Sequence, residues 1–163
     1  MNSLAHDTQF TYTIGVISDT HGLLRPETLN ALQGSNLIIH AGDIGTPEVI
    51  TELKTIAPVI AIRGNNDRGR WATMIPTTQS TTIGEHHIFV IHDVRQLKIN
   101  PIHSQYTVII SGHSHKPTVT EHNGTVFLNP GSAGPRRFSL PTTLARLKIQ
   151  GSHLFHEFIH LDQ

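Results

Sequence analysis

Five short apolar segments of this chain each end in a cluster of Asp, Asn or His side chains, and this recurrence constrains the fold more than any other feature. The apolar segments cover residues 12–18, 37–40, 59–62, 88–91 and 106–110. Their length and their partly β-branched composition are typical of buried β-strands. In open α/β sheets, ligands bind at the carboxyl ends of the strands. We therefore expect the five polar clusters to converge on one site.

The remaining segments predict the rest of the fold. A helix is expected to begin at Pro26, and a second one to carry an apolar face over residues 49–57, which gives the order β-α-β-α-β. Residues 68–79 show no regular pattern. Asn123-Gly124 is a strong hairpin signal, and another hairpin is expected at Gly151. These elements predict an α/β (α+β) fold in which two mixed β-sheets pack as a sandwich flanked by helices.

The composition argues against several classes of function. The 163 residues fit one domain, residues 1–163, of which residues 1–11 form a loose N-terminal extension. The formal net charge of +0 gives no global attraction to a nucleic-acid polymer, and no apolar run suits a membrane span. The N-terminus lacks a signal-peptide pattern, which favours a cytoplasmic location. We expect a small substrate, and the sequence leaves open whether the chain forms a homo-oligomer.

The polar clusters contain side chains that commonly bind divalent metal ions. These residues are Asp19, His21, Asp43, Asn65, His92, His113 and His115. Asp19 and His21 can both reach one ion, His113 and His115 can bind one ion or two, and Asp43 offers two oxygens as a bridging ligand. An isolated Asp-x-His or Gly-Asp is more often a surface turn. Five such clusters, all at strand ends, favour a metal centre.

A centre of this composition suits phosphate ester hydrolysis. Two divalent ions roughly 3.5 to 4 Å apart lower the pKa of a bridging water and clamp the oxygens of a phosphoryl group. Mixed nitrogen and oxygen ligands accept Mn²⁺, Ni²⁺, iron, Co²⁺ or Zn²⁺. We expect two divalent ions, with Mn²⁺ favoured, and a small phosphate ester as the substrate.

The order of the clusters resembles the pattern of the calcineurin-like metallophosphoesterases, namely Asp-x-His, Gly-Asp, Gly-Asn, a lone His and Gly-His-x-His. The likeness is closer to the small single-domain bacterial and archaeal phosphodiesterases, through the segments SDTHGLLRPE, HAGDIG, RGNND, SGHSHKP and NPGSAGPRR. It implies a metallo-dependent phosphatase-like sandwich with a dinuclear centre. One ion would be held by Asp19, His21, Asp43 and His115, and the other by Asp43, Asn65, His92 and His113. We assign catalytic roles to Asp43, Asn65 and His113.

One position departs from the family pattern. Many relatives follow Gly-Asn with a His thought to assist the leaving group, whereas this chain has Asn66. Asn has no proton to donate at neutral pH. A diester with a good leaving group suffers least from that loss, so we expect a phosphodiesterase that uses a metal-activated hydroxide. The alternatives are a phosphomonoesterase, or a non-catalytic scaffold like the retromer subunit that resembles this family.

Four further residues are of interest near these motifs. Asn66 and Arg137 are candidate contacts to the substrate phosphate, although a solvated loop position is the commoner role for such an arginine. Asp93 either orients His92 or caps the helix that follows. His40 precedes the Gly-Asp turn, where a packed histidine is more common than a donor to a metal site.

Overall fold

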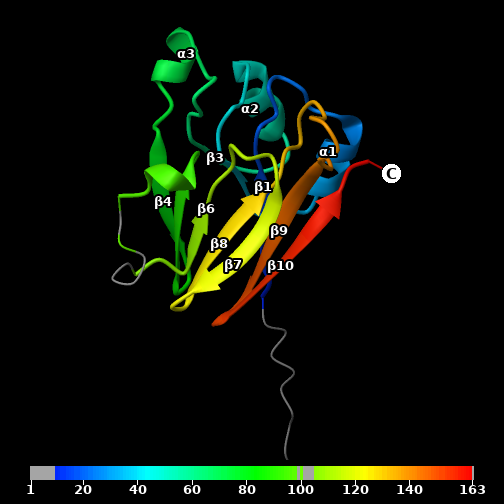
Figure 1. The fold of residues 1–163 in the computed structure, drawn as a ribbon. Helices are drawn as coiled ribbons and strands as arrows, with labels where there is room; N and C mark the ends of the chain where they lie inside the picture. Colours follow the sequence, from blue (N-terminus) through cyan, green and yellow to red (C-terminus); the bar gives the residue numbers. More distant parts are fainter. Residues whose placement is uncertain (1–9, 99, 101–104, 163) are drawn as a thin grey trace, which may run out of the picture.

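The computed structural model describes residues 10–98, 100 and 105–162, which form two five-stranded β-sheets (Figure 1). In the first sheet the strand order is β10 (His153–His160), β9 (Thr143–Gln150), β1 (Tyr12–Ile17), β2 (Leu37–His40) and β3 (Val59–Ala61). In the second sheet it is β4 (Thr78–Ile83), β5 (His86–Ile91), β6 (Val108–Ile110), β8 (Thr125–Pro130) and β7 (Pro117–His122).

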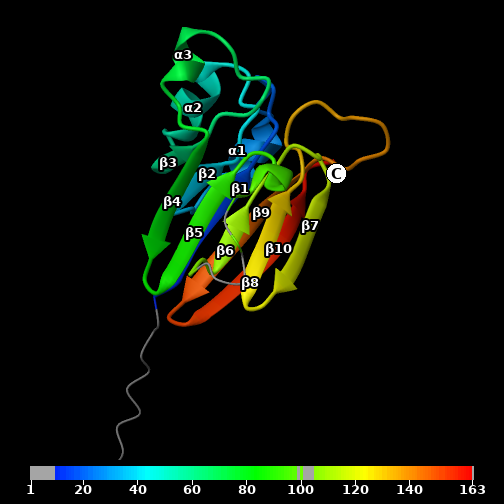
Figure 2. The same ribbon diagram turned by 60° about the vertical axis from the view of Figure 1, so that its left-hand side comes forward.

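Each sheet combines three parallel strands with two antiparallel ones. Strands β1, β2 and β3 are parallel, with β9 antiparallel to β1 and β10 antiparallel to β9. Strands β5, β6 and β8 are also parallel, while β4 and β7 pair antiparallel at the edges (Figure 2). The prediction of two mixed sheets is therefore confirmed. The parallel strands of each sheet end together, so the loops that follow them gather at one end of the sandwich.

The main core lies between the two sheets. It contains alternate residues of each strand, such as Val16 and Ile39 from the first sheet and Val90 and Ile110 from the second. Successive strand residues point to opposite faces, so Ile17 and Ile38 face away from this core. Burying a side chain of this size contributes roughly 1.5 to 3 kcal/mol to folding. The alternation fixes the register of each strand, because a shift by one residue would expose its apolar face.

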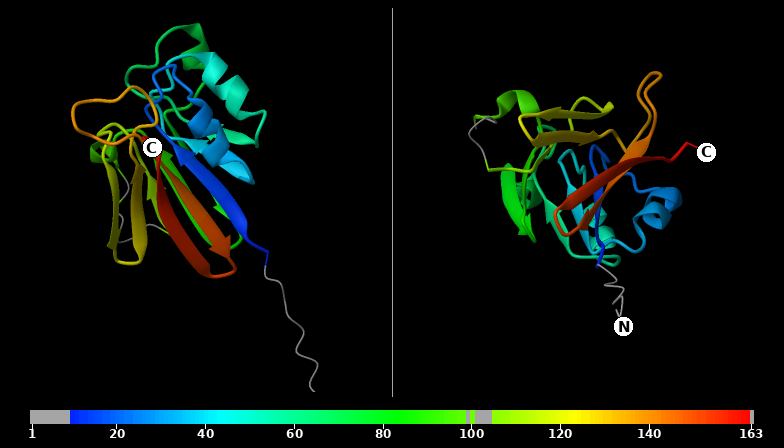
Figure 3. Two further views of the ribbon diagram at one scale, coloured as in Figure 1. Left: turned by 90° about the vertical axis from the view of Figure 1, so that its right-hand side faces the viewer. Right: turned by 90° about the horizontal axis from the view of Figure 1, so that it is seen from below.

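The other face of the first sheet is covered by helices α1 (Pro26–Leu32) and α2 (Pro47–Leu53). Leu32 from α1 and Leu53 from α2 pack there against Ile17 and Ile38, and Figure 3 shows the helices outside the first sheet. The predicted sandwich flanked by helices is thus confirmed on this side. None of the helices in the described ranges is long and apolar enough to cross a membrane.

Two predicted elements differ from the structure. Helix α2 ends at Leu53, whereas we expected its apolar face to continue to Ala57. Ala57 still packs in the cluster between the helices and the first sheet, although it lies beyond the end of the helix. The segment 68–79, predicted to be irregular, contains the one-turn helix α3 (Arg70–Thr73) and the start of β4. Strand β4 is polar and lies at a sheet edge, so it lacks the apolar alternation that identifies a strand.

Both predicted hairpins are present. Asn123 and Gly124 have φ values of 50° and 82°, the pair of positive angles that a tight two-residue turn requires. Gly151 lies in the turn between β9 and β10 with a φ of 56°. Residues 1–9 lie outside the described residues, so the loose N-terminal extension over residues 1–11 stays a prediction.

Candidate metal centre

The loops after five parallel strands carry the seven predicted ligands. We call these seven residues together the candidate metal centre. The loop after β1 carries Asp19 and His21, and those after β2 and β3 carry Asp43 and Asn65. The second sheet contributes His92 after β5, and His113 and His115 after β6. The structure brings side chains from both sheets into contact, so the centre spans the two halves of the sandwich.

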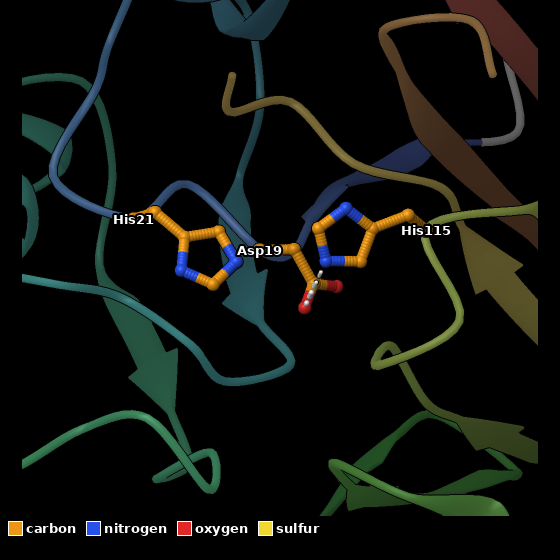
Figure 4. A group of neighbouring side chains, drawn as sticks. All are labelled: Asp19, His21 and His115. Atoms are coloured by element: carbon orange, nitrogen blue, oxygen red, sulfur yellow. Dashed lines mark ion pairs between the residues drawn. The ribbon is translucent and has the colours of Figure 1, made fainter. Parts of the chain in front are cut away.

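One group of potential ligands consists of Asp19, His21 and His115, whose ligand atoms all lie within 4.8 Å of one another. Figure 4 shows the two imidazole rings on either side of the Asp19 carboxylate. The Nε2 atom of His115 is 3.4 Å from Oδ1 of Asp19. Asp19 is fully buried, and His115 is almost fully buried.

A second group consists of Asp19, Asp43 and His92, again with ligand atoms within 4.8 Å of one another. The Nε2 atom of His92 is 3.4 Å from Oδ2 of Asp43 and 3.9 Å from Oδ1 of Asp19. The same Asp43 oxygen is 3.8 Å from Nε2 of His21. Asp19 is therefore shared by the two groups, and Asp43 lies between His21 and His92, which is the position that a bridging ligand needs.

Asn65 and His113 complete the centre on its more exposed side. The Oδ1 atom of Asn65 is 3.1 Å from Nδ1 of His113. The backbone amide of His113 donates a hydrogen bond of 3.1 Å to Oδ2 of Asp19, and its ring lies 5.2 Å from that of His92, centroid to centroid. All seven predicted residues thus lie in one neighbourhood.

Several atoms in the centre are buried without a hydrogen-bond partner. They include Oδ1 of Asp19, Nε2 of His21 and Nε2 of His92. Leaving a buried polar atom unsatisfied costs about 1 to 3 kcal/mol. They belong to the two groups of potential ligands, and divalent cations bound in those groups would satisfy all three. The residues present therefore fit the metal that the ligand types imply.

The backbone of the centre adopts an unusual conformation. Asp19, His21, Asp43, His113 and His115 all have positive φ values, between 47° and 71°. Residues other than glycine rarely adopt this left-handed region, and each such residue is disfavoured by roughly 1 to 3 kcal/mol. Strain of this kind persists where the surrounding structure holds it, and it is concentrated here at the candidate ligands.

Two motif glycines allow the loops to approach the carboxylates. A Cβ atom on Gly64 would lie 2.1 Å from Oδ1 of Asp43. A Cβ atom on Gly112 would lie 2.0 Å from Oγ of Ser18 and 2.7 Å from Oδ2 of Asp19. No real Cβ atom tolerates such distances, so the glycines of the Gly-Asn and Gly-His motifs are sterically required.

Charges in the centre oppose the effect of burial. Burial alone would raise the pKa of Asp43, but the close approach and charge of His92 and the two hydrogen bonds from Asn66 hold it well below its usual range. Burial tends to lower the pKa of His92, yet interactions with Asp43 and Asp19 raise it. Burial lowers the pKa of His21. The Asp43 carboxylate is therefore ionised and available to a cation at neutral pH.

His40 lies beneath the centre and is fully buried. Its Nδ1 atom accepts a 3.2 Å hydrogen bond from the amide of Gly42, so its Nε2–H donates to Oγ1 of Thr20, at 2.9 Å. The Thr20 hydroxyl in turn donates to the carbonyl of Ile44. Burial lowers the pKa of His40 to about 4. The neutral ring braces the two loops that carry Asp19 and Asp43, as expected for a packed histidine.

Asp93 caps the short 3-10 helix η1 (Val94–Gln96), because its Oδ1 accepts a hydrogen bond from the Arg95 amide. The Arg95 guanidinium also donates to both oxygens of Asp93, and these bonds lower the pKa of Asp93 to about 2. Oδ2 of Asp93 is 3.7 Å from Nε2 of His113, to which Arg95 Nη2 donates at 3.1 Å. The prediction that Asp93 caps the following helix is confirmed. The sequence analysis missed Arg95, because this residue belongs to none of the motifs.

The two predicted substrate contacts lie in different surroundings. Asn66 donates from its backbone amide to Oδ1 of Asp43 and from its side chain to Oδ2, both at 2.9 Å. Arg137 is exposed in the loop between β8 and β9, where its charge contributes to the lowered pKa of His21. Asn66 thus contacts a candidate ligand directly, whereas Arg137 faces the solvent near the centre.

The chain matches known proteins over almost its whole length. Residues 12–152 match the model of the calcineurin-like phosphoesterase superfamily domain. A protein of Methanothermobacter thermautotrophicus named "Probable metallophosphoesterase" is 37% identical over 158 residues, covering 90% of this chain and 91% of the relative. A phosphodiesterase of Methanocaldococcus jannaschii is 30% identical over 148 residues, covering 79% of this chain and 89% of the relative.

Solved structures share the fold. An archaeal phosphodiesterase superposes with a TM-score of 0.74 at 26% identity, over 90% of this chain and 99% of that one. Vps29 of Entamoeba histolytica, crystallised with Zn²⁺, superposes with a TM-score of 0.69 at 22% identity, over 92% of this chain and 99% of that one. At that identity, the second likeness concerns the fold alone.

Proposed function

The chain belongs to the calcineurin-like phosphoesterase superfamily, and from this premise we propose that it is a phosphodiesterase with two divalent metal ions in its active site. The observation that carries the proposal is the convergence of buried, unpartnered ligand atoms from Asp19, His21 and His92. The archaeal relative named a phosphodiesterase supports the same bond specificity.

The chain's own residues would bind the ions and hold them in place. When bound, two divalent ions would supply an activated water molecule and neutralise the phosphoryl oxygens. Asp43 lies between His21 and His92 and is the residue that we assign to bridge the two ions. Asn65 and His113 stand at the open side of the centre, where a substrate phosphate can approach.

The residue after Asn65 bears on the choice between a diester and a monoester. The side chain of Asn66 donates its hydrogen bond to Asp43, and an amide cannot protonate a leaving group. Monoesters with poor leaving groups depend most on such protonation. We therefore assign diesters as the preferred substrates, in particular those whose alcohol leaves readily.

Metal dependence is tested on the purified protein freed of metal by a chelator. Mn²⁺ or Ni²⁺ should restore hydrolysis of bis(p-nitrophenyl) phosphate, and elemental analysis should find about two ions per chain. Asp43→Asn should abolish both the hydrolysis and the binding of two ions. Glu157→Gln, at an exposed carboxylate on β10, should leave the hydrolysis and the metal content unchanged. Full activity in the Asp43 variant, or in the metal-free protein, would refute the proposal.

Bond specificity is tested by comparing p-nitrophenyl phosphate with bis(p-nitrophenyl) phosphate. The wild type should favour the diester, and Asn66→His should raise monoester hydrolysis relative to diester hydrolysis. A wild type that prefers the monoester would show a phosphomonoesterase. A protein that binds metal but hydrolyses neither ester would point to the scaffold alternative.

A further inference from the structure

A hollow of about 1110 Å³ opens directly beside the candidate metal centre. Asn65, His92 and His113 form the wall that the hollow shares with the centre. Small-molecule sites in proteins usually measure about 300 to 1,000 Å³. The hollow is therefore large enough for a substantial organic group attached to a phosphate at the centre.

A second, smaller hollow of about 570 Å³ lies on the other side of η1. Asp93, Arg95 and His113 line both hollows, so the Arg95 side chain stands between them. A phosphodiester carries two organic substituents on one phosphorus atom. Two hollows that meet at His113 match that arrangement, with the phosphate at the junction and Arg95 close to it.

The floor of the larger hollow is apolar. Phe89 and Ile91 from β5 line it together with Leu97. Because Ile88 and Val90 belong to the core between the sheets, Phe89 points to the opposite, outer face of the second sheet. Phe89 is half-buried, and its ring packs against Tyr106 with centroids 5.1 Å apart. A fixed aromatic ring of this kind is a suitable surface for a flat substituent.

The accessible charge in the larger hollow is positive. The Asp67 carboxylate accepts hydrogen bonds from the backbone amides of Gly45 and Gly64, and that of Asp93 is bound by Arg95. Arg63 and Lys98 also line the hollow. Neither forms an ion pair with any carboxylate in the part of the chain that the structure describes. Two cations thus remain available to an anionic group.

We propose that the larger hollow binds the larger ester substituent of the substrate, and that it selects a substituent with an aromatic body and an anionic group of its own. Phe89 contacts the aromatic body, and Arg63 and Lys98 contact the anion. This assignment rests on the proposed function, because it places the scissile phosphate at the metal centre.

Three chromogenic diesters with the same leaving group test the assignment. They are methyl p-nitrophenyl phosphate, the p-nitrophenyl ester of thymidine 5′-phosphate, and the same thymidine ester with a 3′-phosphate. With Mn²⁺ present, kcat/KM should rise in that order. Because the leaving group is constant, differences among the three report on the other substituent.

The variants separate the two contacts. Lys98→Gln should lower the preference for the 3′-phosphorylated ester over the unphosphorylated one by about threefold, the size of an exposed charge contact. Phe89→Leu should lower the preference for the thymidine ester over the methyl ester by about threefold. Lys148→Gln, which removes a half-exposed cation of β9 that pairs with Glu157 outside both hollows, should change neither preference.

Different results would contradict the role of the larger hollow and the diesterase activity. Equal kcat/KM for all three diesters, or equal effects of Lys98→Gln and Lys148→Gln, would overturn the inference while leaving the diesterase intact. If no diester is hydrolysed, calorimetry with thymidine 3′,5′-bisphosphate still tests the hollow. Wild type should then bind about threefold more tightly than Lys98→Gln, and equal affinities would overturn the inference.

Discussion

The buried histidine beneath the centre makes the folding free energy of the metal-free protein depend on pH. His40 is neutral in the folded protein, where burial lowers its pKa to about 4, against about 6.5 in an unfolded chain. Between these values the unfolded chain binds the extra proton, so acid favours unfolding. The stabilisation is fully present above pH 7 and is lost as the pH falls from about 6.5 to about 4.

The size of the effect follows from the two pKa values. A difference of about 2.5 units corresponds to about 3 kcal/mol in total, and about 2 kcal/mol of this is lost by pH 5. His40→Gln cannot take up the proton. Between pH 7.5 and pH 5, the free energy of unfolding of the wild type should therefore fall about 2 kcal/mol further than that of the variant.

Urea unfolding followed by circular dichroism measures this difference, with a chelator present so that metal binding does not contribute. Any pH-independent destabilisation by Gln shifts the whole curve and leaves the slope comparison valid. NMR titration of the wild-type His40 ring gives a separate check, with a midpoint near pH 4 expected. Parallel stability curves, or a ring midpoint near pH 6.5, would refute the reasoning.

Three other substitutions test the packing around the centre and in the core. Gly64→Ala should weaken metal binding more than about tenfold by calorimetry, because its Cβ would displace Asp43; unchanged affinity would show that the loop adjusts freely. Ile110→Ala, fully buried between the sheets, should lower the free energy of urea unfolding by about 2 to 5 kcal/mol. Glu157→Gln should lower it by less than about 1 kcal/mol, with the difference shrinking in high salt, because its ion pair with Arg146 is exposed.

Much of the fold could be predicted because its parallel strands are apolar and its turns carry specific residues. Strand β2 is buried along its whole length, and Asn123-Gly124 has few conformations other than a tight turn. The start of the polar edge strand β4, within the segment 68–79, escaped prediction, since it is held by pairing with β5 and not by its own composition. Helix α2 was predicted too long because Ile56 and Ala57 keep the apolar spacing after the helix has ended.

The seven predicted ligands lie together because the parallel strands that precede them end at the same edge of each sheet. What the sequence could not show is the arrangement between loops. That Asp93 lies beside His113, the next proposed ligand along the chain, follows from the pairing of β5 with β6. The position of Arg95 depends on a single turn of helix, and the two hollows on either side of it depend on loop packing.

The left-handed backbone of the candidate ligands has an evolutionary consequence. Glycine adopts positive φ freely, and asparagine does so at a smaller penalty than most residues. Replacing Asp19 or Asp43 by glycine would relieve strain, and replacing it by either residue would remove a buried negative charge. These substitutions also break hydrogen bonds, from Asn66 to Asp43 and from the His113 amide to Asp19, so the relief of strain offsets only part of their cost and stability protects the centre only in part. Selection for the proposed metal site then supplies the rest of the protection, and a lineage freed from that selection would lose the site while keeping the sandwich.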